Sequence, residues 1–125
     1  MKRSVYLFVG LVTLFVCGVP ASPQQLPPEA MEHMDRGRAA MDRSQYHEAI
    51  AEFRRVLKMS NTCAECCMHL VRAYQQLGAH KDALEMARKV LEIVHDDRSR
   101  AIAHNLIGVE TSVLEIGRAS CRERV

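Results

Sequence analysis

Three closely spaced cysteines are the side chains of this protein best suited to chemistry. Cys63, Cys66 and Cys67 fall together in the middle of the 125 residues, while the other two cysteines stand near the chain ends. Residues three apart at a helix start lie within disulfide range, so a Cys63–Cys66 bridge is one interpretation. Cys67 as a buried packing residue is a second, and a redox or metal site is a third. Zinc needs about four ligands and only His69 is close in sequence, so we predict no metal site.

Other catalytic patterns do not stand out in the sequence. His47-Glu48 is not followed by the second histidine that a helical zinc protease requires. His33 and His104 occupy positions expected to pack within helical pairs. The sequence also offers no Ser/His/Asp set and no Gly-rich phosphate loop. We therefore predict no catalytic residues and no cofactor, and a protein that is not an enzyme.

The sequence contains a repeat of 34 residues, because residues 30–63 match residues 64–97 at many positions when the two segments are aligned. The structure of this repeat should position the cysteines and histidines. Self-similarity at this period is typical of stacked helix–turn–helix units rather than of a single closed core. The matched pairs are Ala30/Ala64, Met34/Met68, Arg38/Arg72, Ala39/Ala73, Ala49/Ala83, Arg54/Arg88, Val56/Val90 and Leu57/Leu91.

The spacing of apolar residues predicts helical hairpins over residues 31–59 and 64–94, followed by one helix from 101 to about 114. The first helix should break near Ser44, and Gly78 should supply the left-handed residue that ends the third. Asp96 and Asp97 are interpreted as a solvated turn. The expected fold is all-α, with antiparallel helical hairpins stacked as an α–α superhelix and truncated in the third repeat.

The second helix of the first hairpin carries a recurrent pattern. Residues Tyr46 to Leu57 contain, in order, an aromatic residue, a small residue, a second aromatic residue and apolar residues at the end. The next repeat matches the pattern at Leu70, Tyr74, Gly78, Ala83 and Ala87. Ala101 with Ile107-Gly108 is similar to the start of a third repeat. These residues resemble the tetratricopeptide repeat family. The first repeat departs from the pattern more than the second, since Arg36 stands before Gly37 where the family has leucine.

The resemblance implies a protein-binding scaffold in which the first helix of each repeat lines a concave groove. The residues that would face this groove are Met34, Arg38, Met41, Asp42, Met68, Arg72, Gln75 and Gln76. Paired methionines and arginines suit an adaptable apolar contact with an anionic or carbonyl-rich peptide. An ordinary solvated helix face with long amphipathic side chains is the alternative.

Both chain ends are interpreted separately from the repeats. Residues 1–21 begin with positively charged residues, continue with an apolar run and end with small residues, as a signal peptide does. We therefore expect an exported protein, periplasmic or secreted, with an uncleaved membrane anchor as the alternative. Residues 22–29 form a Pro-rich linker. Residues 116–125 resemble a translated sequencing adapter, so 115–125 are interpreted as a non-native tail. The repeat domain is then 30–114, divided into 30–63, 64–97 and a partial 101–114.

Charge excludes one class of partner. The full chain has a formal charge of +2, but without residues 1–21 and 116–125 it keeps 12 basic and 14 acidic residues. We therefore expect no nucleic-acid binding, membrane contact only transiently through the signal peptide, and a protein or peptide partner of unknown identity, with self-association left open. Two other functions remain: a Cys-based redox or metal-binding protein, and the docking portion of a longer enzyme.

Overall fold

The computed structural model describes residues 26–124, which form five helices and no strand. The predicted signal peptide and residues 22–25 of the predicted linker lie outside the described residues. The predicted all-α architecture is confirmed. The helices are α1 (Pro28–Asp42), α2 (Tyr46–Met59), α3 (Ala64–Gln76), α4 (His80–Ile93) and α5 (Asp97–Glu123).

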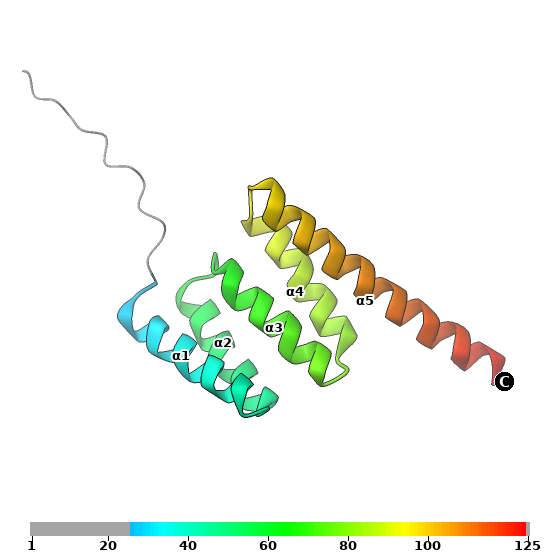
Figure 1. The fold of residues 1–125 in the computed structure, drawn as a ribbon, viewed down its shortest axis with the longest axis horizontal. Coiled ribbons are helices and arrows are strands. Elements are labelled where there is room, and N and C mark those ends of the chain that lie inside the picture. Colours follow the sequence, from blue (N-terminus) through cyan, green and yellow to red (C-terminus); the bar gives the residue numbers. More distant parts are fainter. Residues whose placement is uncertain (1–25, 125) are drawn as a thin grey trace, which may run out of the picture.

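The helices form two hairpins and a final single helix. α1 packs against α2, and α3 packs against α4 (Figure 1). The hairpins join through α2 and α3, and α5 packs along α4. Each helix therefore packs against the next along the chain, as stacked repeats require.

The same turn ends the first helix of both hairpins. Ser44 and Gly78 have left-handed backbones, with φ of 59° and 69°. The amides of Gln45 and Ala79 each donate, at 2.9 Å, to the carbonyl five residues earlier, which is the Schellman motif. The predicted break near Ser44 and the predicted role of Gly78 are both confirmed.

Small residues allow close helix approach, and one large residue fills the space between the helices. Ala49 and Ala83 are fully buried at equivalent positions of α2 and α4. The fully buried Phe53 ring of α2 packs against Gly37 of α1, so closely that a Cβ at Gly37 would lie 2.6 Å from the ring. The close crossing of α1 and α2 therefore depends on Gly37, whose lack of a side chain leaves room for the Phe53 ring.

The fifth helix differs from its prediction at both ends. It begins at Asp97 rather than Ala101, because the Asp96 side chain accepts a hydrogen bond from the Ser99 amide at 2.8 Å and so caps the helix. This hydrogen bond lowers the pKa of the Asp96 carboxyl. Asp96 lies in an exposed bend, in agreement with the interpretation as a solvated turn, but Asp97, also exposed, is already the first residue of α5. The helix also runs on to Glu123, through the segment interpreted as a non-native tail.

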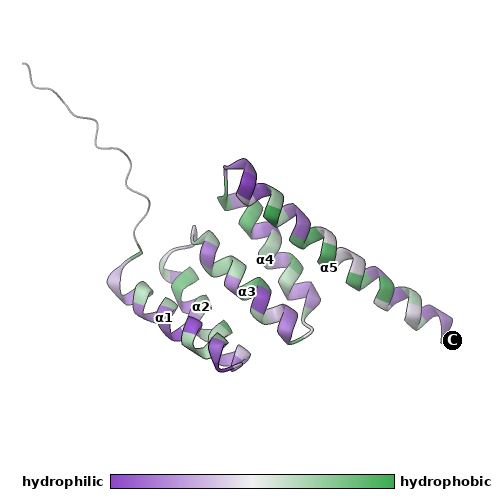
Figure 2. Cartoon of the chain, viewed as in Figure 1, coloured by the Kyte–Doolittle hydropathy of each residue, from purple (hydrophilic) through white to green (hydrophobic). Residues whose placement is uncertain are grey.

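One side of α5 carries apolar residues that none of the other helices described in residues 26–124 covers. They recur along the helix (Figure 2) and comprise Ile102, Val109, Val113 and Ile116. Ala103 is fully buried, and Leu106 and Ile107 pack against the core. α5 is therefore anchored to α4 along one side and exposes a neighbouring apolar stripe.

Candidate functional site

A hollow of about 550 Å³ lies between α1 and the start of α3, beside the segment that leads into α1. We call it the α1–α3 pocket. The lining residues are Leu26, Pro28, Met31, Met34, Asp35, Arg38 and Glu65. Two of the residues predicted to face a groove, Met34 and Arg38, thus lie at this pocket.

The floor of the α1–α3 pocket is apolar. Met34 is only 3% exposed, and its sulfur lies 3.8 Å from the sulfur of Cys66. Since Cys66 is disulfide-bonded and carries no thiol hydrogen, this is a van der Waals contact between sulfurs. Met31, which also lines the pocket, is 54% exposed. The pocket therefore presents adaptable apolar surface to solvent.

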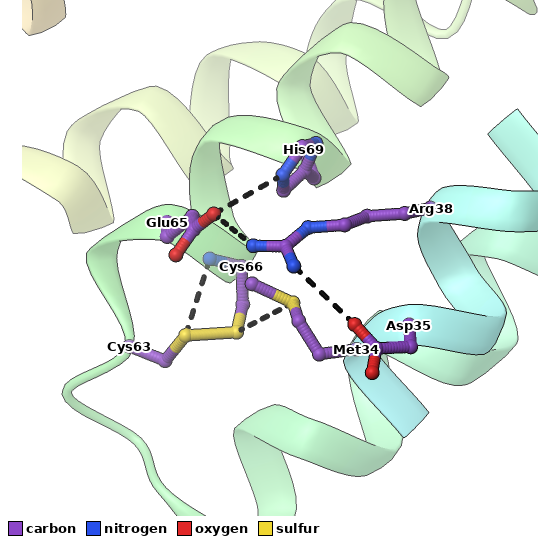
Figure 3. Close-up of polar contacts among 7 residues, drawn as sticks. All are labelled: Met34, Asp35, Arg38, Cys63, Glu65, Cys66 and His69. Carbon is purple, nitrogen blue, oxygen red and sulfur yellow. Dashed lines mark hydrogen bonds and ion pairs between the residues drawn. A yellow bond between two sulfur atoms is a disulfide. The ribbon is translucent and has the colours of Figure 1, made fainter. Parts of the chain in front are cut away.

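The rim of the pocket is charged and internally paired. Arg38 extends from α1 to Glu65 on α3, with which it forms an ion pair, and its guanidinium also lies 3.4 Å from Asp35 (Figure 3). The hydrogen bond to Glu65 raises the pKa of Arg38. Two carboxylates and one guanidinium leave the rim with one net negative charge. Arg38 was predicted to bind an anionic or carbonyl-rich peptide, but its charge is already paired with Asp35 and Glu65 of the same chain.

A disulfide lies beneath the pocket. Cys63 and Cys66 are joined, with their Cα atoms 5.3 Å apart, and the Cys63 sulfur accepts a hydrogen bond from the Cys66 amide at 3.2 Å, which caps α3 (Figure 3). Cys67 stands apart as a free, fully buried thiol that packs with Val90 and Ala103. Burial raises the pKa of the Cys67 thiol, so this sulfur is an inert core residue.

His69 supports the same region from α3. Its ring stacks on Phe53 with centroids 4.9 Å apart, and its Nε2 lies 3.7 Å from Glu65. Burial lowers the pKa of His69, although the neighbouring Glu65 partly opposes this. The imidazole therefore favours its neutral form, and Glu65 keeps Arg38 as its charged partner.

The remaining predicted groove residues do not line this pocket. Met41 and Met68 are half-buried against the core. Arg72, Gln76 and Asp42 are exposed. Gln75 donates to Glu110 of α5 at 2.6 Å. The methionine and arginine positions that repeat in the sequence thus have different surroundings in the two hairpins.

Sequence reasoning missed two groups of residues. Leu26, Met31, Asp35 and Glu65 line the α1–α3 pocket, but the contact between Arg38 and Glu65 joins residues far apart in sequence and leaves no local signal. The second group surrounds Glu110, which is 1% exposed. Its carboxylate accepts a hydrogen bond from Gln75 and lies 2.8 Å from His80 Nδ1. This buried carboxylate links three helices, and only its place on the packed side of α5 could have indicated it.

Within residues 26–124, no group of three or more histidine, cysteine or acidic side chains is placed to hold a metal ion. None of the helices described there combines the length and apolar character needed to cross a bilayer.

These features together define a repeat protein of stacked helical hairpins, with a partly apolar pocket between the first helices of neighbouring repeats. A family model described as tetratricopeptide repeat matches residues 40–104, more than half of the chain. The protein belongs to the tetratricopeptide repeat family. No similar sequence was found among curated proteins. The family generally mediates protein–protein interaction and is generally non-enzymatic.

Proposed function

We propose that this protein is a non-enzymatic scaffold whose partner places an apolar side chain in the α1–α3 pocket, next to a cationic group. The observation that carries the proposal is the combination of an apolar floor and a rim with one net negative charge at a single hollow. The repeated methionine and arginine positions of the sequence suited an anionic or carbonyl-rich peptide. The pairing of Arg38 with Glu65 and Asp35 reverses the sign of the expected partner.

The apolar floor supplies the affinity in this proposal. Met31 is half-exposed in the free protein, so a ligand side chain that covers it removes apolar surface from water. Covering half of a methionine side chain contributes roughly 1 kcal/mol. The flexible thioether side chains of Met31 and Met34 can adapt to leucine, methionine or phenylalanine.

The charged rim supplies selectivity. Asp35 and Glu65 have side chains 74% and 54% exposed, so a lysine or arginine beside the apolar anchor can reach them from solvent. An exposed ion pair contributes about 0.2–1 kcal/mol. Each cationic residue should therefore improve the affinity up to about fivefold over a neutral one.

A pair of labelled peptides tests the proposal. The cationic probe is fluorescein-labelled Ser-Lys-Leu-Met-Lys-Ser, and the anionic probe replaces both lysines with glutamate. Fluorescence anisotropy should show tighter binding of the cationic probe. Met31→Gln should weaken this binding about fivefold through loss of the apolar contact, and Asp35→Asn should reduce the preference for the cationic probe.

Matched controls are available on the same chain. Met59 is an exposed methionine on α2, and Asp42 is an exposed aspartate at the end of α1, and neither lines the α1–α3 pocket. Met59→Gln and Asp42→Asn should leave probe binding unchanged. Equal affinity for the two probes, or equal losses in test and control variants, would contradict the proposed site.

We also propose that the protein is exported, as residues 1–21 predict. The disulfide between Cys63 and Cys66 supports this, because disulfides persist in oxidising compartments. Expression of the full chain in a bacterial host should give a periplasmic product that begins at Ser22. A cytosolic product that retains Met1 would contradict export.

A further inference from the structure

We propose that the Cys63–Cys66 disulfide is a redox-sensitive element that sets the shape of the α1–α3 pocket, so that reduction by an external dithiol dismantles the pocket. The consequence for ligand affinity rests on the proposed function. The consequence for the shape of the pocket rests on the contacts of the disulfide alone.

Two lining residues of the pocket depend directly on the disulfide. The Cys66 sulfur lies 3.8 Å from the sulfur of Met34, which forms the floor. Glu65, which forms the rim, stands inside the short loop that the disulfide closes. The closed loop therefore fixes both the surface on which Met34 rests and the position from which Glu65 meets Arg38 (Figure 3).

The disulfide also holds the first turn of α3. The Cys63 sulfur accepts the amide hydrogen of Cys66, which would otherwise lack a partner at the helix start. A second hollow beside this turn is lined by Leu26, Cys63 and Glu65, among others. Leu26 and Glu65 thus line both hollows, and a loosened turn has space into which it can move.

The exchange reaction must begin at Cys63. Cys63 is 8% exposed and Cys66 is fully buried, so the thiolate of an incoming dithiol reaches the Cys63 sulfur. The sulfur–sulfur bond breaks, and Cys66 leaves as a thiolate that takes up a proton. The second thiol of the reductant then displaces Cys63 as a thiol, and the reductant is released as a cyclic disulfide. Cys67 is buried on the side of α4 and α5, so it takes no part.

Methionine-methyl NMR of the full chain, with and without dithiothreitol, tests the proposal. Thiol counting establishes that the disulfide has opened. Reduction should shift the Met34 methyl resonance, leave that of Met86 on α4 in place, and weaken binding of the cationic probe roughly tenfold if about a tenth of the molecules keep a competent pocket. An unchanged Met34 resonance in fully reduced protein, or a shifted resonance in protein that binds the probe equally tightly in both redox forms, would overturn the proposal.

A variant separates the disulfide from other effects of the reductant. Cys63→Ser with Cys66→Ala removes the bridge but keeps a side chain that caps helices well. It should resemble the reduced wild type and should not respond to dithiothreitol. If it fails to fold, the comparison of oxidised and reduced wild type still decides. If Met34 responds but neither redox form binds the probe, the proposed ligand is wrong, whereas control of the pocket by the disulfide stands.

Discussion

Replacement of Gly37 by alanine should destabilise the protein, although the same change elsewhere in a helix stabilises it. The added Cβ would lie 2.6 Å from the Phe53 ring, and that ring is fully buried. Overpacking of this kind costs about 1–3 kcal/mol. Alanine regains about 1 kcal/mol of helix propensity over glycine, so the net loss for Gly37→Ala should be up to about 2 kcal/mol.

Gly108→Ala is the matched control. Gly108 also lies within a helix but, apart from its chain neighbours and the backbone of its own helix, no atom in residues 26–124 stands within 4 Å of the position its Cβ would occupy. This variant should gain roughly 0.5–1 kcal/mol. Urea unfolding followed by circular dichroism measures both variants, and their difference, about 1–3 kcal/mol, isolates the cost of the clash. If Gly37→Ala is as stable as Gly108→Ala, the packing of Phe53 against α1 is wrong.

Two further predictions concern helix capping and pH. Asp96→Ala should lower the stability because the Ser99 amide loses its acceptor, whereas Asp97→Ala, which removes no capping side chain, should cost less; thermal unfolding of both variants checks this. His69 has a lowered pKa in the folded state, mainly because of burial, so the unfolded chain binds its proton more readily and the folded state loses stability as pH falls below about 6.5. His69→Phe, which keeps the stack on Phe53, should lose less stability than the wild type between about pH 7.5 and about pH 5, and an identical loss in both proteins would refute this.

Much of the fold was predictable because its determinants are local. Apolar spacing within each segment set the four helices of the two hairpins, and Gly78 marked the end of α3 through its own conformational freedom. The start of α5 was misjudged because the family pattern was aligned on Ala101, while the physical start is decided by the side chain of Asp96. The strict 34-residue offset from Ala64 gives residue 98, which agrees with the capped start better than Ala101 does.

The candidate site was less predictable because its contacts cross between helices. Met34 and Arg38 were found through their repetition in the sequence. Their partners Glu65 and Cys66 come from the next repeat, and the equivalent residues of that repeat meet different neighbours. The charge preference of the site depends on the pairing of Arg38, which periodicity does not encode.

If the α1–α3 pocket binds an apolar anchor with a cationic neighbour, methionine-methyl NMR should detect the ligand at the pocket itself. During titration with the cationic probe, the methyl resonances of Met31 and Met34 should shift and saturate together. Those of Met59 and of Met86, which lines a separate hollow along α4, should stay in place. Saturable shifts at Met59 or Met86 with Met31 and Met34 unmoved, or no shifts at all, would contradict the claim.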